Sequence, residues 1–136
     1  ATYLDGLVKL NNKLLRILQR KPVETPLIEL YDDYNTLSVP ELHNQQLLLL
    51  AHRFLYNNNE LPEIFHDYFA VNRTVHDYET RTSSDLHLSR IDTNFGNRHL
   101  RFKAAFLWNQ LPPELKEQQS QRHFKLLVKN YLCGAN

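Results

Sequence analysis

Five consecutive apolar residues, Leu47 to Ala51, lie within the segment that most strongly constrains the fold of this 136-residue chain. The segment opens on Ser38-Val39-Pro40-Glu41, a capping box in which the Ser38 side chain takes a backbone amide and Glu41 reaches back to the cap. The helical pattern then continues to about Tyr56. Because a helix that is apolar around most of its circumference is buried on several sides, we expect a central helix on which the other elements pack.

Apolar periodicity on both sides of this segment predicts further helices. The first runs from Tyr3 to about Arg20 and is amphipathic, because its spacings of three, four and seven place Leu4, Leu7, Val8, Leu14, Leu15 and Leu18 on one face. Start and stop signals predict helices at about 25–34, 61–69, 103–111 and 120–134, with a helical turn at 113–118. The fold class is therefore mainly α, a compact bundle of about six helices in a single domain that spans residues 1–136.

The stretch from Leu86 to Pro112 has a different pattern. Leu86, Leu88 and Ile91 predict a short strand, residues 94–97 have turn chemistry, and apolar residues at 100 and 102 continue the alternation. We therefore expect a small β-hairpin at about 86–102. Its apolar residues, together with Trp108, are expected to hold the helices together.

Several classes of function lack their sequence signatures. A single Cys and seven scattered His residues give no zinc-site spacing, and three isolated Gly residues do not form a phosphate-binding loop. No apolar run has the length of a membrane span. We expect a chain that is not an enzyme, has no cofactor, metal or small-molecule substrate, is not associated with a membrane, and is intracellular, in the nucleus or the cytoplasm.

Basic residues supply the candidate nucleic-acid contacts, in two sets. The first, Lys9, Lys13, Arg16 and Arg20, forms a continuous stripe along one face of the first helix. The second lies in and before the 86–112 stretch, near Phe95 and Phe102, where cations can pair with phosphates while rings stack on bases. It comprises Arg73, Arg81, Arg90, Arg98, Arg101 and Lys103.

Each set also has a structural interpretation. The stripe is favoured as a solvated helix face. Phe102, Phe106 and Trp108 are alternatively core residues that pack inward from their helix, and for Trp108 this interpretation is favoured. Arg81 is the natural ion-pair partner of an acid such as Asp85, whereas for Arg98 and Arg101 both interpretations stay open. Residues 1–22 carry five basic residues and one acid, but residues 23–70 carry one Arg and eight acids, and such a segment favours a protein partner over a nucleic acid.

A series of motifs runs in order over nearly the whole chain. They are LVKLNNKLLRIL (7–18), TPLIELYDDYNTLSVPELHNQQLLLLAHRF (25–54), LPEIFHDYF (61–69), VHDYETR (75–81), DLHL (85–88), TNFGNR (93–98), LWNQLP (107–112), FK (124–125) and YL (131–132). In this order and combination, the chain resembles the C-terminal region of the reverse transcriptases encoded by non-LTR (LINE-like) retrotransposons, downstream of their polymerase domain.

This resemblance implies a non-catalytic domain that binds element RNA, target DNA or both in support of target-primed reverse transcription. Its further partner would be the remainder of the reverse transcriptase, which would carry the polymerase activity. The chain contains no Met, so we expect it to be an excerpt of a larger polyprotein. The alternative is a structural or protein-interaction module that docks on the polymerase core or serves another assembly.

Overall fold

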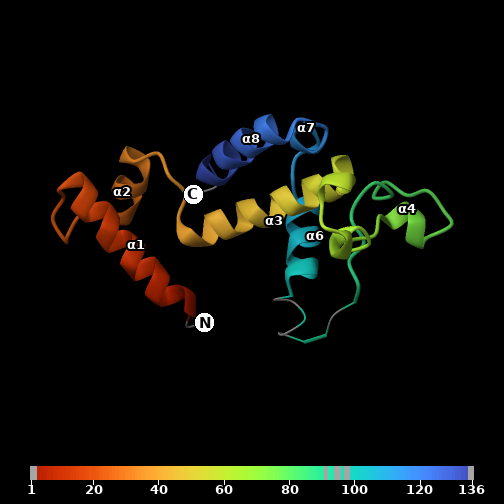
Figure 1. The fold of residues 1–136 in the computed structure, drawn as a ribbon, viewed down its shortest axis with the longest axis horizontal. Coiled ribbons are helices and arrows are strands. Elements are labelled where there is room, and N and C mark those ends of the chain that lie inside the picture. The colour runs from red at the N-terminus through yellow and green to blue at the C-terminus, as the bar shows by residue number, and fades with distance from the viewer. Residues whose placement is uncertain (1–2, 91, 94–95, 97–98, 135–136) are drawn as a thin grey trace.

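A computed structural model describes residues 3–90, 92–93, 96 and 99–134, and in this part of the chain the fold is mainly α, as predicted. Within the described residues there are seven α-helices, which Figure 1 labels, and two short 3-10 turns, Asn58–Glu60 and Glu63–Phe65. The helices are α1 (Tyr3–Gln19), α2 (Leu27–Asp33), α3 (Val39–Tyr56), α4 (Asn72–Val75), α6 (Leu100–Asn109), α7 (Pro113–Lys116) and α8 (Gln121–Gly134).

The predicted central helix is confirmed as α3. Its capping box is formed, and the Glu41 carboxylate accepts the Ser38 backbone amide at 2.8 Å. The apolar run then lies between α6 and α8, both of which pack on α3 (Figure 1). Leu48, Ala104 and Val128, one from each of these helices, are almost completely buried. The main core is therefore a three-helix contact centred on the segment that the sequence marks most clearly.

Aromatic rings fill the middle of this core. His52 of α3 stacks on Phe124 of α8, with ring centroids 4.3 Å apart and planes 18° apart. Trp108 of α6 lies 5.6 Å from Phe124 and is 2% exposed, which confirms its assignment to the core.

α1 and α2 form a separate lobe at one end of the molecule, packed on the start of α3 (Figure 1). Its buried apolar residues, Leu15, Leu30 and Leu37, lie outside the main core cluster. Polar contacts join the two helices: the Tyr31 hydroxyl donates to Asn12, and the Gln19 amide donates to the Leu30 carbonyl at 2.7 Å. Lys21 then pairs with Glu29 and Asp33.

The apolar face predicted for the first helix is mostly exposed to solvent. Leu15 is buried and Val8 is half-buried, but Leu4, Leu7, Leu14 and Leu18 are all exposed. The face that turns toward α2 and α3 is instead the more polar one, which carries Asn12 and Gln19. α1 does have an apolar face, but most of the residues on that face point away from the rest of the described chain.

Two local predictions also need correction. The helix expected at 61–69 is replaced by the 3-10 turn Glu63–Phe65, and Ile64 is 81% exposed. Phe106, expected to pack inward from its helix, is nearly half exposed.

The β-hairpin expected at 86–102 is not formed by the described residues of that segment. His99 caps α6 by accepting the Arg101 amide on its side chain, so Leu100 and Phe102 are helical rather than extended. Leu86 makes a single antiparallel bridge, to Val71. The turn residues Asn94, Phe95 and Asn97, together with Ile91, lie outside the described residues.

Candidate nucleic-acid interface

The predicted basic residues do not form one surface. Lys9, Lys13, Arg16 and Arg20 belong to the α1 lobe, whereas Arg73 and Arg81 lie in and just after α4, at the opposite end of the molecule (Figure 1). Arg101 and Lys103 lie at the start of α6, Arg90 lies in the segment that precedes it in the chain, and Arg98 lies outside the described residues.

The stripe on α1 is interrupted. The Arg16 guanidinium donates to the Thr25 carbonyl at 3.3 Å, so it holds the turn between α1 and α2. Arg20 follows the end of the helix in a left-handed conformation, with φ of 53°. Lys9 and Lys13 are exposed on the helix itself. Only these two side chains of the set keep the geometry that the stripe predicted.

The residues near α6 are also divided. Arg90 pairs with Asp92 at 3.6 Å on an open surface. Arg101 lines a small hollow of about 160 Å³ with His87 and His99. Lys103 is half-buried close to His43, whose pKa is lowered by burial and then by the Lys103 charge.

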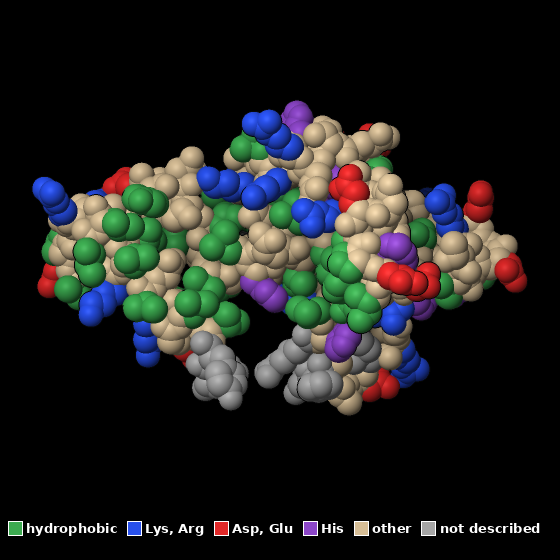
Figure 2. All heavy atoms as spheres, in the orientation of Figure 1, with side chains coloured by type: hydrophobic (Ala, Val, Ile, Leu, Met, Phe, Trp, Pro, Cys, Tyr) green, Lys and Arg blue, Asp and Glu red, His purple; other side chains and the backbone are tan. Residues whose placement is uncertain are grey.

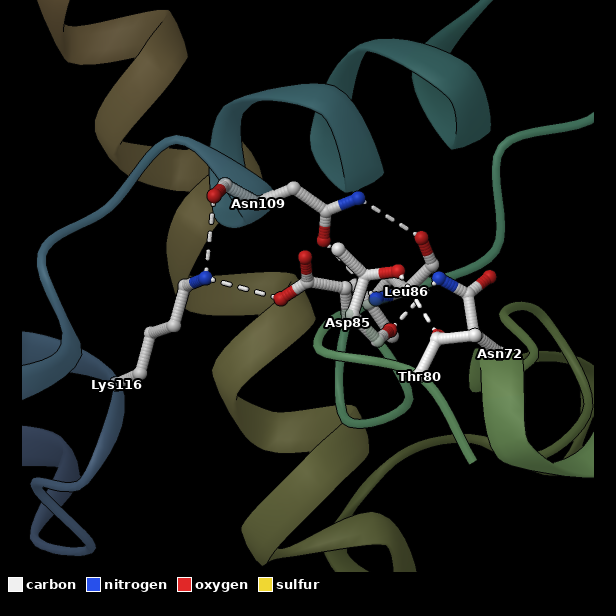
Figure 3. A network of polar contacts seen from close by, with 7 residues as sticks. Asn72, Thr80, Asp85, Leu86, Asn109 and Lys116 are labelled. Atoms are coloured by element: carbon white, nitrogen blue, oxygen red, sulfur yellow. Dashed lines mark hydrogen bonds and ion pairs between the residues drawn. The ribbon is translucent and has the colours of Figure 1, made fainter. Parts of the chain in front are cut away.

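α4 and the loop that follows it carry Arg73 and Arg81, and a network of polar contacts around Leu86 holds this segment (Figure 3). The side-chain amide of Asn109 donates to the Leu86 carbonyl at 2.8 Å and accepts the Leu86 amide at 2.9 Å. On the other side of Leu86, the backbone of Asn72 donates to the Asp85 carbonyl at 2.9 Å. The Leu86 backbone therefore has its bridge partner Val71 on one side and the Asn109 side chain on the other. Asn109 makes the two hydrogen bonds that a neighbouring strand would make in a sheet.

Lys116 completes this network. Its ammonium donates to the Asp85 carboxylate and to the Asn109 carbonyl, each at 3.1 Å (Figure 3). Asp85 is thus paired with Lys116, not with Arg81 as the structural interpretation expected. Arg73 and Arg81 are both exposed beside it.

These two arginines line the same groove, which the sequence did not predict. The groove encloses about 610 Å³ between the end of α3, α7 and the loop that follows α4. Its lining includes the apolar residues Leu55, Trp108 and Pro113 and the aromatic Tyr56, and Asp85 and Glu117 add negative charge. Cations beside an aromatic ring are features that known single-strand-binding proteins use to contact nucleic acids.

A second groove has a more favourable charge for a phosphate backbone. It encloses about 580 Å³ between α3 and α8, and we refer to it as the α8 groove. Arg122, Lys125 and Lys129 line one wall, and Gln45 and Gln46 line the other. Among the described residues that line it there is no Asp or Glu. Figure 2 shows Lys and Arg side chains gathered over α8.

Backbone contacts fix the geometry of the α8 groove. The Gln45 amide donates to the Lys125 carbonyl at 3.2 Å, and Lys129 donates to the Asn35 carbonyl at 2.6 Å. The Lys125 and Arg122 side chains are exposed. The groove therefore has a rigid floor and two cations that solvent and ligands reach freely.

Sequence reasoning missed this groove, although part of its signal was available. Arg122, Lys125 and Lys129 are three and four residues apart, which places them on one helix face. The opposite wall comes from α3, about 80 residues earlier, and no local pattern predicts that contact.

Within the described residues, no group of three or more His, Cys, Asp and Glu side chains is arranged to hold a metal ion. The described helices include none with the length and apolarity that crossing a membrane requires. Comparison with protein-family models, curated proteins and solved structures finds no match to this chain.

Proposed function

We propose that this chain is a non-catalytic nucleic-acid-binding domain that contacts phosphate backbones through the α8 groove. The observation that carries the proposal is the set of three cations, Arg122, Lys125 and Lys129, in a groove whose described lining residues include no carboxylate. The groove beside Arg73 and Arg81 offers a second contact with an aromatic wall. The motif resemblance supports the same class of ligand and gives it a context: element RNA or target DNA during target-primed reverse transcription.

Charge counts explain why the α8 groove is ranked first. Three cations with no opposing acid leave a local excess of positive charge, and phosphate neutralisation releases counterions from the nucleic acid. In the other groove, Asp85 and Glu117 offset two of the three cations. Phosphate contacts of this kind position a nucleic acid without reading its sequence.

The salt dependence of binding tests the proposal. Affinity for a short RNA and for a DNA duplex is measured between low and moderate salt, for the unaltered chain and for Arg122→Ala/Lys125→Ala. Each lost phosphate contact lowers the slope of log affinity against log salt by about 0.9 for a duplex or about 0.7 for a single strand. We therefore expect the double variant to lower the slope by roughly 1.4 to 1.8.

The matched control is Lys9→Ala/Lys13→Ala, which removes the same charge from exposed positions on α1. We expect its slope to equal that of the unaltered chain. Gln45 binds the carbonyl of Lys125 and not its side chain, so the groove variant keeps its fold. Absence of binding at low salt overturns the proposal, and a slope that falls equally in both variants overturns the choice of groove.

A second candidate function is favoured by a different observation. The outward side of α1 is apolar and exposed, which suits a protein-interaction module, the alternative that the acidic middle segment also supports. Docking through this side depends on apolar burial, so substitutions in the α8 groove leave it unchanged.

A further inference from the structure

α1 presents an apolar surface that nothing within the described part of the chain covers. Its members are each about half exposed or more: Leu4 (49%), Leu7 (50%), Leu10 (64%), Leu14 (51%), Ile17 (63%) and Leu18 (54%). We refer to these six residues as the α1 seam. Figure 2 shows hydrophobic side chains gathered over the α1 and α2 lobe.

This exposure is unusual because α1 already has a buried side. Asn12 and Leu15 are buried, and Gln19 and Arg16 are bound to α2 and to the turn before it. α1 therefore turns one side to its own chain and a second, more apolar side to the outside. Contiguous exposed patches of this kind mark interaction surfaces in folded proteins.

The spacing within the α1 seam is that of a helix pair. Leu7, Leu10, Leu14 and Ile17 are separated by three, four and three residues, which is the repeat that packs two helices side by side along a continuous line. We propose that the α1 seam is a homodimer interface, in which α1 packs antiparallel against α1 of a second copy of this chain. This specifies the partner for the second candidate function and does not depend on nucleic-acid binding.

The flanks of the seam favour a second copy in this orientation. Lys13 and Arg20 border one flank, and Leu4 and Leu18 border the other. When one helix of a pair is reversed, equal flanks meet, so Leu4 of one copy packs against Leu18 of the second copy. All six members are then buried. The unfavourable contact is between the two Lys13 side chains, which are exposed and screened by salt.

The area also fits a reversible dimer. Six side chains of this size and exposure offer on the order of 600 Å² per copy, compared with roughly 800 Å² per partner in a standard specific interface. We therefore expect association in the micromolar range of dissociation constants, weaker than in an obligate dimer. Such an interface is isologous, with the same residues contributed by both copies.

Sedimentation equilibrium over a range of protein concentrations tests the proposal. We expect the full chain to shift from monomer to dimer with concentration, and we expect Leu10→Glu/Leu14→Glu to stay monomeric throughout. The control is Ile28→Glu, because Ile28 on α2 has the same exposed fraction, 64%, as Leu10 but lies outside the seam. The control variant is expected to dimerise like the unaltered chain.

A charge-pairing experiment tests the orientation. In the antiparallel pair, position 7 of one copy faces position 17 of the second. Leu7→Glu and Ile17→Lys should each weaken the dimer alone, and an equal mixture should restore a heterodimer, whereas two parallel helices give no rescue. Raising the salt should strengthen the dimer of the unaltered chain by screening Lys13, whereas an acidic partner helix would be weakened.

Three outcomes overturn the inference. One is a full chain that remains monomeric at high concentration. Another is an equal loss of dimer in the Ile28→Glu control, which moves the interface away from α1. The third is a mixture of charged variants that fails to associate. None of these outcomes changes the salt slopes for RNA and DNA, so failure here is distinguishable from failure of nucleic-acid binding.

Discussion

Asn109 is the residue on which the arrangement of the α4 loop depends most directly. Its amide makes both hydrogen bonds of the buried Leu86 backbone, at 2.8 and 2.9 Å. We expect Asn109→Ala to lower the free energy of unfolding by about 2–4 kcal/mol, because two backbone groups lose their partners away from water. Denaturant unfolding measures this loss. Gln110→Ala, at the next and exposed position, is the control and should change stability by less than about 0.5 kcal/mol.

His52 makes the stability of the core depend on pH. Its Nε2 atom lies 2.6 Å from the Gln118 carbonyl, and its buried Nδ1 atom has no partner within the described residues. Burial lowers the pKa of His52 below its ordinary value of 6.5, and the Gln118 contact offsets this only in part. Below about pH 6.5 the unfolded chain therefore binds a proton that the folded chain does not.

The free energy of unfolding should consequently fall as the pH is lowered from 6.5 toward the folded-state pKa of His52. We expect His52→Phe to be less dependent on pH in this window, as measured by denaturant unfolding at several pH values. Some dependence should remain in the variant, because burial and Lys103 also lower the pKa of His43. An unchanged pH profile in His52→Phe would show that this ring is not responsible.

The burial of some residues can be predicted from the sequence, whereas the partners of others cannot. The burial of Trp108 follows from its size and apolarity, and the structure confirms it. The pairing of Asn109 with Leu86 spans 23 residues, so no local spacing indicates it. For the same reason the structural interpretation offered Asp85 as an example of an acid that pairs with Arg81, four residues earlier in the chain, whereas the partner of Asp85 is Lys116.

At the scale of elements, α1 contains a position that limits its own stability. Gly6 lies in the helix, and a Cβ atom added there meets nothing within 4 Å. Gly6→Ala should therefore stabilise α1 by about 0.5–1 kcal/mol, because Gly loses more backbone freedom on folding than Ala does. Hydrogen exchange of the α1 amides measures the change. Slower exchange is expected in α1 with no change in α8, and faster exchange would contradict this account.

Helix positions were largely predictable, because caps and apolar periodicity are local. α3 begins where Ser38 and Glu41 predict it, and α8 covers nearly all of the helix predicted at 120–134. The hairpin prediction was wrong because apolar residues at 100 and 102 fit either a strand or the first turn of a helix. The His99 cap stabilises the helix. For α1, periodicity indicated an apolar face without indicating which neighbour, if any, covers it.

At the scale of the whole molecule, the two parts of the fold should differ in stability. The main cluster joins buried residues from α3, α6 and α8, whereas the lobe buries only Leu15, Leu30 and Leu37 of its own apolar side chains in the described structure. We expect the amides of α1 to exchange with solvent through openings of lower free energy than those of α3. Hydrogen exchange with mass spectrometry, performed on dilute monomer, compares the two segments directly. Equal protection would show that lobe and core unfold as one unit.

At this scale, the sequence does not predict which residues of the candidate site share a surface. Of the ten predicted basic residues, Arg73 and Arg81 are brought to one groove, while Arg16 holds a turn and Lys9 and Lys13 lie at the far end of the molecule. A count of charges along the chain does not say which of them share a surface, because that depends on how the helices cross.

The position of Trp108 gives the protein a built-in optical reporter. It is the sole Trp of the chain and is enclosed by the rings of His52 and Phe124. Its emission should be blue-shifted in the native protein and should respond to events in the α3, α6 and α8 core, while melting of α1 and α2 leaves it unchanged. Far-ultraviolet circular dichroism records every helix. A difference between the unfolding curves followed by Trp108 emission and by circular dichroism would therefore report the unfolding of the α1 and α2 lobe alone.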